Sequence, residues 1–254
     1  SSLNGGAPTV LTQAMNDLNS YTAFGGVAQA DDLDGNRLDD GVFLYKWDFL
    51  NRLRQVKRKA DGQTTNYLYD SWGANSHLNG SGRRIRKVVS KVIIHPVTPL
   101  APDQEEALLV PGPVVARPIL LADVTRYLYD GWRVIEERDQ LDKVTQQYVD
   151  GAWIDEHLTM DRYTPAGGFL NTRFYHEDAK GWVAALTDAS GAVVERYSYA
   201  AYGAPKFLDA LGNPLANQAK SGQGNPYLYC GMRWDPEYRG FNVRHRTLSP
   251  GRMI

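Results

Sequence analysis

Apolar residues along much of this chain recur at every second position, between short turns that contain glycine. Residues 125–153, TRYLYDGWRVIEERDQLDKVTQQYVDGAW, repeat the pattern twice. Tyr127 and Tyr129 are two residues apart and are followed by Asp130 and Gly131. Residues two apart face the same side of a β-strand, and Asp-Gly supplies the positive φ that tight hairpin turns require. The pattern therefore predicts β-hairpins.

The same unit recurs through the chain. Within residues 182–203 it predicts a strand over 183–187, a turn at Ser190 and Gly191, and a second strand over 193–199. A single hairpin is barely stable alone, so successive hairpins should lie side by side and bury a common core. The fold class predicted is all-β, made of successive antiparallel hairpins.

The recurring aromatic residues are predicted to pack between strands, although a face that stacks on sugars or bases is the alternative. The Asp that follows an aromatic pair is expected to accept backbone N–H groups in the turn. The residues assigned to this structural role are Tyr67, Tyr69, Asp70, Tyr127, Tyr129, Asp130, Trp182, Tyr197, Tyr199, Tyr202, Tyr227 and Tyr229.

We place the repeat at residues 31–246, where two segments interrupt it, and a further irregular segment precedes it. Residues 1–30 are poorly patterned and predicted irregular, with room for one short helix. Residues 90–124 contain six prolines, which remove ladder donors, so a surface insertion with at most short edge strands is expected. Residues 206–226 are rich in Gly, Asn, Ala and Pro and are predicted to form a long loop.

Composition narrows the function classes. Over 254 residues the net charge is −1, so no overall attraction to nucleic acid or anionic membrane is expected. Cys230 is the single cysteine, which excludes an internal disulfide, and it is predicted to be a small buried hydrophobe. No apolar run is long enough for a membrane helix. The amino-terminal residues lack a signal-peptide pattern, and we interpret the chain as a fragment or processed piece.

Candidate chemistry is sparse. Asp32, Asp34, Asn36 and Asp39 could bind calcium, but their spacing does not fit an EF-hand, and a solvated turn is favoured. His176 next to Glu177 and Asp178 suggests acid–base chemistry, although a hydrogen-bonded strand-end histidine is the commoner case. Two basic stretches, 82–92 and 239–246, could form a nucleic-acid patch, but strands with one apolar face and one solvated basic face are favoured. No residue is assigned a catalytic, cofactor-binding or metal-ligating role, and no cofactor is expected.

The repeat resembles the tyrosine–aspartate (YD) repeats of the Rhs family. The matching stretches are YKWDFLNRLRQV, YLYDSWG, HEDAKGWVAALTDASGAVVERYSYAAYGAP and NPYLYCGMRWDPEYRGFNVRHR. The last is similar to the segment that leads into the Rhs-associated core. The resemblance covers about residues 30–254. It implies kinship with toxin-complex C proteins and teneurins, and YD-repeat hairpins that form part of a curved or spiralling β-shell.

In that family the shell encloses a toxin domain, and the core acts as an aspartic autoprotease. Ser249 stands where the family has an Asp in Y-Y-D-P, so residues 247–254 form a truncated, degenerate core end. We therefore expect a non-enzymatic scaffold, a portion of a shell that encloses or displays a C-terminal toxin or effector. A cell-surface carbohydrate or adhesion module is one alternative. A remnant autoprotease using Asp235 or Asp188 is the other.

The resemblance also implies partners and location. The expected partners are an enclosed toxin domain or neighbouring shell segments, and a cell-surface glycan or protein is a further candidate. Pairing through open sheet edges would make an oligomer. No nucleic-acid partner and no membrane insertion are expected. The protein is predicted to be secreted or at the cell surface.

Overall fold

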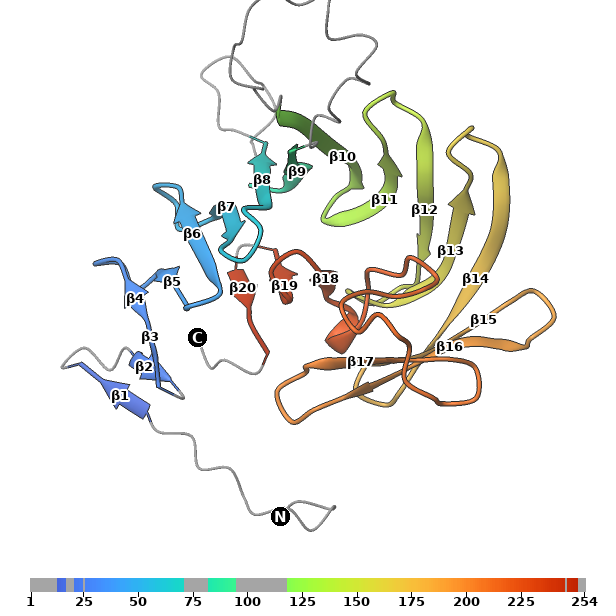
Figure 1. Cartoon of the computed structure of the whole chain (residues 1–254). Helices are drawn as coiled ribbons and strands as arrows, with labels where there is room; N and C mark the ends of the chain where they lie inside the picture. Colours follow the sequence, from blue (N-terminus) through green and yellow to red (C-terminus); the bar gives the residue numbers. More distant parts are fainter. Residues whose placement is uncertain are drawn as a thin grey trace, which may run out of the picture.

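The computed structural model describes residues 13–16, 21–24, 26–70, 82–94, 118–244 and 246–250. These residues form almost entirely antiparallel β structure, which confirms the predicted fold class (Figure 1). A 14-stranded sheet has its strands side by side in chain order, from β4 to β17. Two three-stranded sheets complete the fold. One is β1-β2-β3, and the other consists of β18 (Arg233–Asp235), β19 (Gly240–Val243) and β20 (Arg246–Leu248). In this part of the chain no helix is long and apolar enough to cross a membrane.

The strands of the first small sheet are β1 (Gln13–Met15), β2 (Tyr21–Phe24) and β3 (Val27–Ala28). The large sheet begins with β4 (Ala30–Asp31), β5 (Arg37–Asp39), β6 (Phe43–Trp47), β7 (Leu53–Arg58), β8 (Thr64–Tyr69) and β9 (Arg84–Ile94). It continues with β10 (Pro118–Asp130), β11 (Arg133–Arg138), β12 (Val144–Asp150) and β13 (His157–Tyr163). It ends with β14 (Phe169–Glu177), β15 (Val183–Thr187), β16 (Val193–Tyr199) and β17 (Pro205–Leu208).

A recurring aspartate turn joins many of these strands. One carboxylate oxygen accepts the backbone N–H groups of the residues two and four positions later, and the residue three positions later has a positive φ. These bonds satisfy donors that a hairpin end would otherwise expose. The aspartates are Asp32, Asp48, Asp139, Asp178, Asp188 and Asp209. Of the predicted residues, Asp130 is exposed, and Asp70 accepts from the Arg83 side chain, while the residues that follow Asp70, 71–81, lie outside the described part.

The predicted tyrosine pairs face the concave side of the sheet. The first tyrosine of each pair, Tyr67, Tyr127 or Tyr197, is buried, with at most 6% of its surface exposed. The hydroxyl of the second can donate to a backbone carbonyl on the adjacent strand, as Tyr69 on β8 does to Leu53 on β7 and Tyr199 on β16 does to Val183 on β15. Each pair thus contributes packing from one residue and an inter-strand tether from the other. Tyr202, assigned to the same role, is instead 60% exposed.

Several segments expected to be irregular contain paired strands. The candidate amino-terminal helix is wrong where the chain is described, since β1 and β2 lie there. Both ends of the predicted proline-rich insertion belong to β9 and β10, which pair from Arg86–Arg126 out to Ile94–Pro118 in the interior of the sheet. Residues 95–117 lie outside the described part. The predicted loop at 206–226 begins within β17 and is otherwise irregular.

The tether at Tyr199 generates a stability prediction. Its ring packs edge-on against Trp182, with centroids 5.7 Å apart, and its hydroxyl donates to the Val183 carbonyl at 2.6 Å. Replacing it with alanine should lower the free energy of unfolding by about 3 kcal/mol, because packing and the hydrogen bond are both lost. Tyr199→Phe should cost only about 1 kcal/mol. Urea denaturation measures the free energy of unfolding of both variants. An unchanged midpoint for Tyr199→Ala would contradict the structural role assigned to Tyr199.

Candidate functional site

Residues 225–248, here called the C-terminal segment, lie within the curve of the large sheet (Figure 1). The segment contains η2 (Tyr229–Gly231), β18 (Arg233–Asp235), β19 (Gly240–Val243) and β20 (Arg246–Leu248). Leu228 and Phe241 are fully buried, in a core cluster with the inward side chains of β10 to β17. Tyr238 packs edge-on against Tyr67 in a second cluster, formed with β6 to β8. The segment therefore fills the concave face across both halves of the sheet.

Buried ion pairs join the C-terminal segment to the sheet. Arg84 donates to Asp235 at 2.6 Å, with side chains 4% and 0% exposed, and Lys87 donates to Glu237 at 2.9 Å. Arg233 pairs with Glu137 on β11. Arg84 and Lys87 belong to the basic stretch 82–92, which was expected to present a solvated basic face. That expectation is wrong for these two residues, because their counter-charges lie in the C-terminal segment.

The electrostatics of this region favour the ionised forms. Burial alone would raise the pKa of Asp235, but Arg84, Lys87 and Arg233 outweigh it and hold that pKa below its ordinary value. Burial alone would lower the pKa of Arg84, which its acidic neighbour Asp235 raises well above the usual range. These groups are therefore charged at neutral pH.

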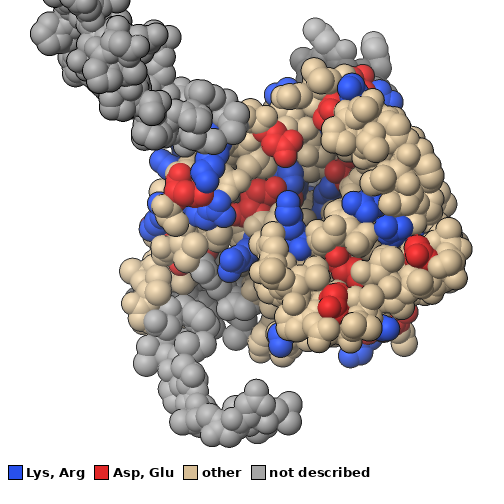
Figure 2. Space-filling model, turned by 45° about the vertical axis from the view of Figure 1, so that its right-hand side comes forward, with Lys and Arg blue, Asp and Glu red and all other residues tan. Residues whose placement is uncertain are grey.

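A cavity of about 80 Å³ lies between the C-terminal segment and the ends of β9 to β13. Its walls combine positive charge with aromatic rings, and Figure 2 shows a hollowed face with Lys, Arg, Asp and Glu gathered around it. The cationic lining residues are Arg83, Arg84, Arg133, Arg233 and Arg244. The other lining residues used below are Tyr129, Trp132, Asp150, Asp155, His157 and Tyr227.

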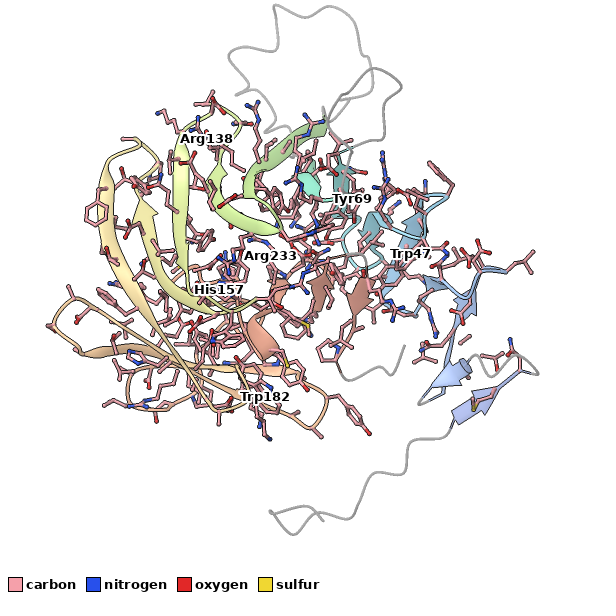
Figure 3. The ribbon with its side chains drawn as sticks, turned by 180° about the vertical axis from the view of Figure 1, so that it is seen from behind. Trp47, Tyr69, Arg138, His157, Trp182 and Arg233 are labelled. Atoms are coloured by element: carbon pink, nitrogen blue, oxygen red, sulfur yellow. The ribbon has the colours of Figure 1, made fainter. Side chains whose placement is uncertain are left out.

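His157 is held rigidly in the wall of this cavity, close to Arg233 (Figure 3). Its Nδ1 is 2.7 Å from an Asp150 carboxylate oxygen and its Nε2 is 2.9 Å from the Gly231 carbonyl oxygen. The Asp150 carboxylate and the Gly231 carbonyl are both hydrogen-bond acceptors, and the two contacts fix the orientation of the ring. The ring also stacks on Tyr227, with centroids 3.8 Å apart. His157 thus fastens η2 of the C-terminal segment to β12.

The structure separates the residues that were proposed to act together. His176 contacts Thr187 Oγ1 at 2.9 Å, whereas its neighbour Glu177 accepts the backbone N–H of His157 on the other side of β14. Burial raises the pKa of Glu177. Adjacent residues in a strand face opposite ways, so the sequence neighbours His176 and Glu177 do not form an acid–base pair.

The other candidates also have structural roles. Asp235 is neutralised by Arg84, and Asp188 accepts the backbone N–H groups of the β15–β16 turn. Cys230 is half-buried rather than buried, and burial raises the pKa of its thiol. Ser249 is half-buried after β20.

The acidic group at residues 32–39 forms a turn, as favoured. Asp32 accepts N–H groups from Asp34 and Asn36, and Asp39 pairs with Lys59. Among the described residues no cluster of three or more His, Cys, Asp or Glu could hold a metal ion. His77, His95 and His245 lie outside that part of the chain.

The sequence interpretation did not identify the arginine-lined cavity. Arg83 and Arg84 are on β9 or just before it, Arg133 begins β11, and Arg233 and Arg244 come from the C-terminal segment. No spacing in the chain joins these positions. One local signal was available, since Trp132 and Arg133 directly follow the tight Asp130–Gly131 turn and are therefore placed at a hairpin end.

Comparison with solved structures agrees with this architecture. The chain resembles TcdB2-TccC3 crystallised without its hypervariable C-terminal region, with a TM-score of 0.50 at 15% identity, covering 82% of this chain and 8% of that one. A TcdB2-TccC3-Cdc42 structure gives a TM-score of 0.53 at 13% identity, over 93% and 10%. No family model matches. The chain therefore shares the β fold of part of the TcdB2-TccC3 structures.

Similar curated proteins have names that state an activity, which the fold alone does not indicate. The tRNA3(Ser)-specific nuclease WapA of Bacillus spizizenii and the tRNA nuclease WapA of Bacillus subtilis strain 168 are each 27% identical over 249 residues. The match covers 96% of this chain and 8% of each relative, so the chain spans a small part of their length.

These relatives overturn three expectations. Proteins named tRNA nucleases contradict the prediction of a non-enzymatic scaffold, the statement that the protein is not an enzyme, and the exclusion of nucleic acid as a partner. The net charge of −1 misled here, because it averages over the chain and does not describe local surfaces. The aromatic rows that would have favoured a carbohydrate-binding module are largely buried.

The Arg84–Asp235 pair yields a pH prediction. Asp235→Asn should lower the free energy of unfolding by about 3–5 kcal/mol at pH 7, because it leaves the Arg84 charge buried without its partner. The folded-state pKa of Asp235 lies below the unfolded value of about 3.9. The contribution of the ionised Asp235 carboxylate to the free energy of unfolding is therefore complete above the unfolded-state pKa. It is lost as the pH falls through the folded-state pKa.

Urea denaturation of both proteins from pH 7 to pH 2 tests this. The stability difference should be constant at neutral pH and shrink below about pH 4. Asp142→Asn is the matched control, because Asp142 is 60% exposed in its pairs with Arg126 and Arg138 and should cost under about 1 kcal/mol. Equal costs for the two substitutions would contradict a buried, dominant ion pair.

Proposed function

We propose that this chain is part of a longer polypeptide that cleaves tRNA, and that its hairpins are YD repeats of the Rhs type. The observation that carries the proposal is the 27% identity, over 96% of the chain, to proteins named tRNA nucleases. The similarity extends through the hairpins and the C-terminal segment alike, so it reflects more than one shared motif. Cleavage is assigned to the polypeptide as a whole, because this chain spans 8% of those relatives.

The geometry supports the YD-repeat part of the proposal. The Tyr-x-Tyr pairs at 67, 127 and 197 occupy equivalent inward positions on β8, β10 and β16. The equivalent residues Tyr69 and Tyr199 each donate to a carbonyl on the adjacent strand in the same manner. A repeated sequence unit with repeated contacts is what a repeat fold requires. Export to the cell surface or beyond, which the sequence resemblance implies, stays a prediction.

Incubating tRNA with the natural polypeptide that contains residues 1–254 tests the proposed activity. Denaturing gel electrophoresis should show discrete tRNA fragments that accumulate with time and with protein concentration. Discrete fragments are expected because an enzyme that acts on tRNA recognises its folded shape and exposed single strands.

The control is the same purification from cells that lack the gene, which removes host nucleases from consideration. A second control is a duplex DNA of similar length, which should remain intact. Intact tRNA after incubation with the folded natural polypeptide would overturn the proposed function.

A further inference from the structure

We infer that the arginine-lined cavity binds a phosphate group of single-stranded RNA, with a neighbouring base stacked on Trp132. The choice of RNA rests on the proposed function, whereas the phosphate site rests on the cavity alone. The argument uses the unpartnered donors, the charge balance, the size of the cavity and the position of the indole.

Two buried guanidinium groups in the wall have unused donors. The Nε–H groups of Arg84 and Arg233 have no hydrogen-bond partner among the described residues, and both arginines line the cavity. The Arg84 side chain is only 4% exposed. A buried donor without an acceptor costs about 1–3 kcal/mol. Both Nε atoms have almost no accessible surface, so a ligand in the cavity would bind through the other N–H groups of the lining arginines, and guanidinium groups match phosphate oxygens in geometry as well as charge.

The charge balance favours a ligand with one negative charge. Four lining arginines already have carboxylate partners: Arg83 with Asp70, Arg84 with Asp235, Arg233 with Glu137 and Arg244 with Asp155. The remaining carboxylate, Asp150, is held by His157. Arg133 differs, because its contacts in the described part are the backbone carbonyls of Ala152 and Trp153. Arg133 therefore supplies one positive charge that matches the single charge of a phosphodiester group.

The cavity has room for a phosphate group, and an exposed aromatic side chain is among its lining residues. A water needs roughly 10–15 Å³ of such volume, so about 80 Å³ accommodates several waters or an oxyanion. Trp132 lines the cavity, is 43% exposed and stands next to Arg133 on the β10–β11 turn. Stacking of a base on an aromatic side chain contributes about 1–3 kcal/mol.

Fluorescence anisotropy of a labelled single-stranded RNA dodecamer, titrated with the full 254-residue chain, tests the inference. Arg133→Gln should weaken RNA binding at least tenfold, as expected for loss of a charge-assisted contact worth about 1.5–3 kcal/mol. Arg133→Lys should bind with intermediate affinity, because it keeps the charge and loses the planar fork. Urea denaturation of each variant shows that the fold is retained.

Arg126→Gln is the matched control. Arg126 lies on the neighbouring β10, outside the cavity lining, and its pair with Asp142 is exposed. Arg126→Gln removes the same charge as Arg133→Gln and should change the affinity for RNA less than twofold. Equal losses for Arg126→Gln and Arg133→Gln would indicate general electrostatic attraction and overturn the site.

Competitors distinguish the sources of the oxyanion. Inorganic phosphate should displace RNA at millimolar concentration, and Trp132→Ala should weaken RNA binding while leaving phosphate competition unchanged. Displacement by a glutamate-rich peptide as readily as by unlabelled RNA would overturn RNA as the ligand.

If the natural polypeptide cleaves tRNA but the chain fails to bind the dodecamer, this inference fails and the proposed function stands. If the chain binds RNA and the polypeptide cleaves nothing, only the proposed function fails.

Discussion

The structure depends on filling the concave face of one long curved sheet with the chain's own C-terminal segment. Sheets of many strands twist, and each hairpin alone buries too little surface to be stable. Here the inward tyrosines of the hairpins pack against Leu228, Tyr238 and Phe241 of that segment. The Arg84–Asp235 pair fixes its position, because a buried ion pair tolerates little displacement. The repeat therefore supplies the wall, and residues far along the chain make it a single folded unit.

This arrangement also produces the cavity. Charged residues from β9, β11 and the C-terminal segment must be paired where they meet, and the pairing leaves two Nε–H donors unused and Arg133 without a carboxylate among the described residues. His157 secures the opposite wall through Asp150 and the Gly231 carbonyl. A rigid, donor-rich cavity at the junction is thus a consequence of how the sheet is filled. Its walls are preorganised, which lowers the entropic cost of binding an oxyanion.

Local pattern predicted the hairpins well and the tertiary pairing poorly. The strands at 183–187 and 193–199 and the turn at Ser190 and Gly191 were predicted correctly, because period-two alternation and turn glycines act within a few residues. The prediction that the side chains of Arg84 and Lys87 face solvent was wrong, because their acidic partners lie about 150 positions away in the sequence. The cavity was missed for the same reason. The function was misjudged because overall composition says little about a chain that spans a small part of its relatives.

Native-state hydrogen exchange followed by NMR tests the central claim most directly. If the C-terminal segment completes the fold, the amides of β18 and β19 should exchange with the same opening free energy as the inner strands β11 to β16, because neither part persists without the other. Exchange of β18 and β19 at a much lower free energy, with the sheet still protected, would contradict the account. The large sheet would then be stable without the segment, and the buried ion pairs would be secondary to the fold.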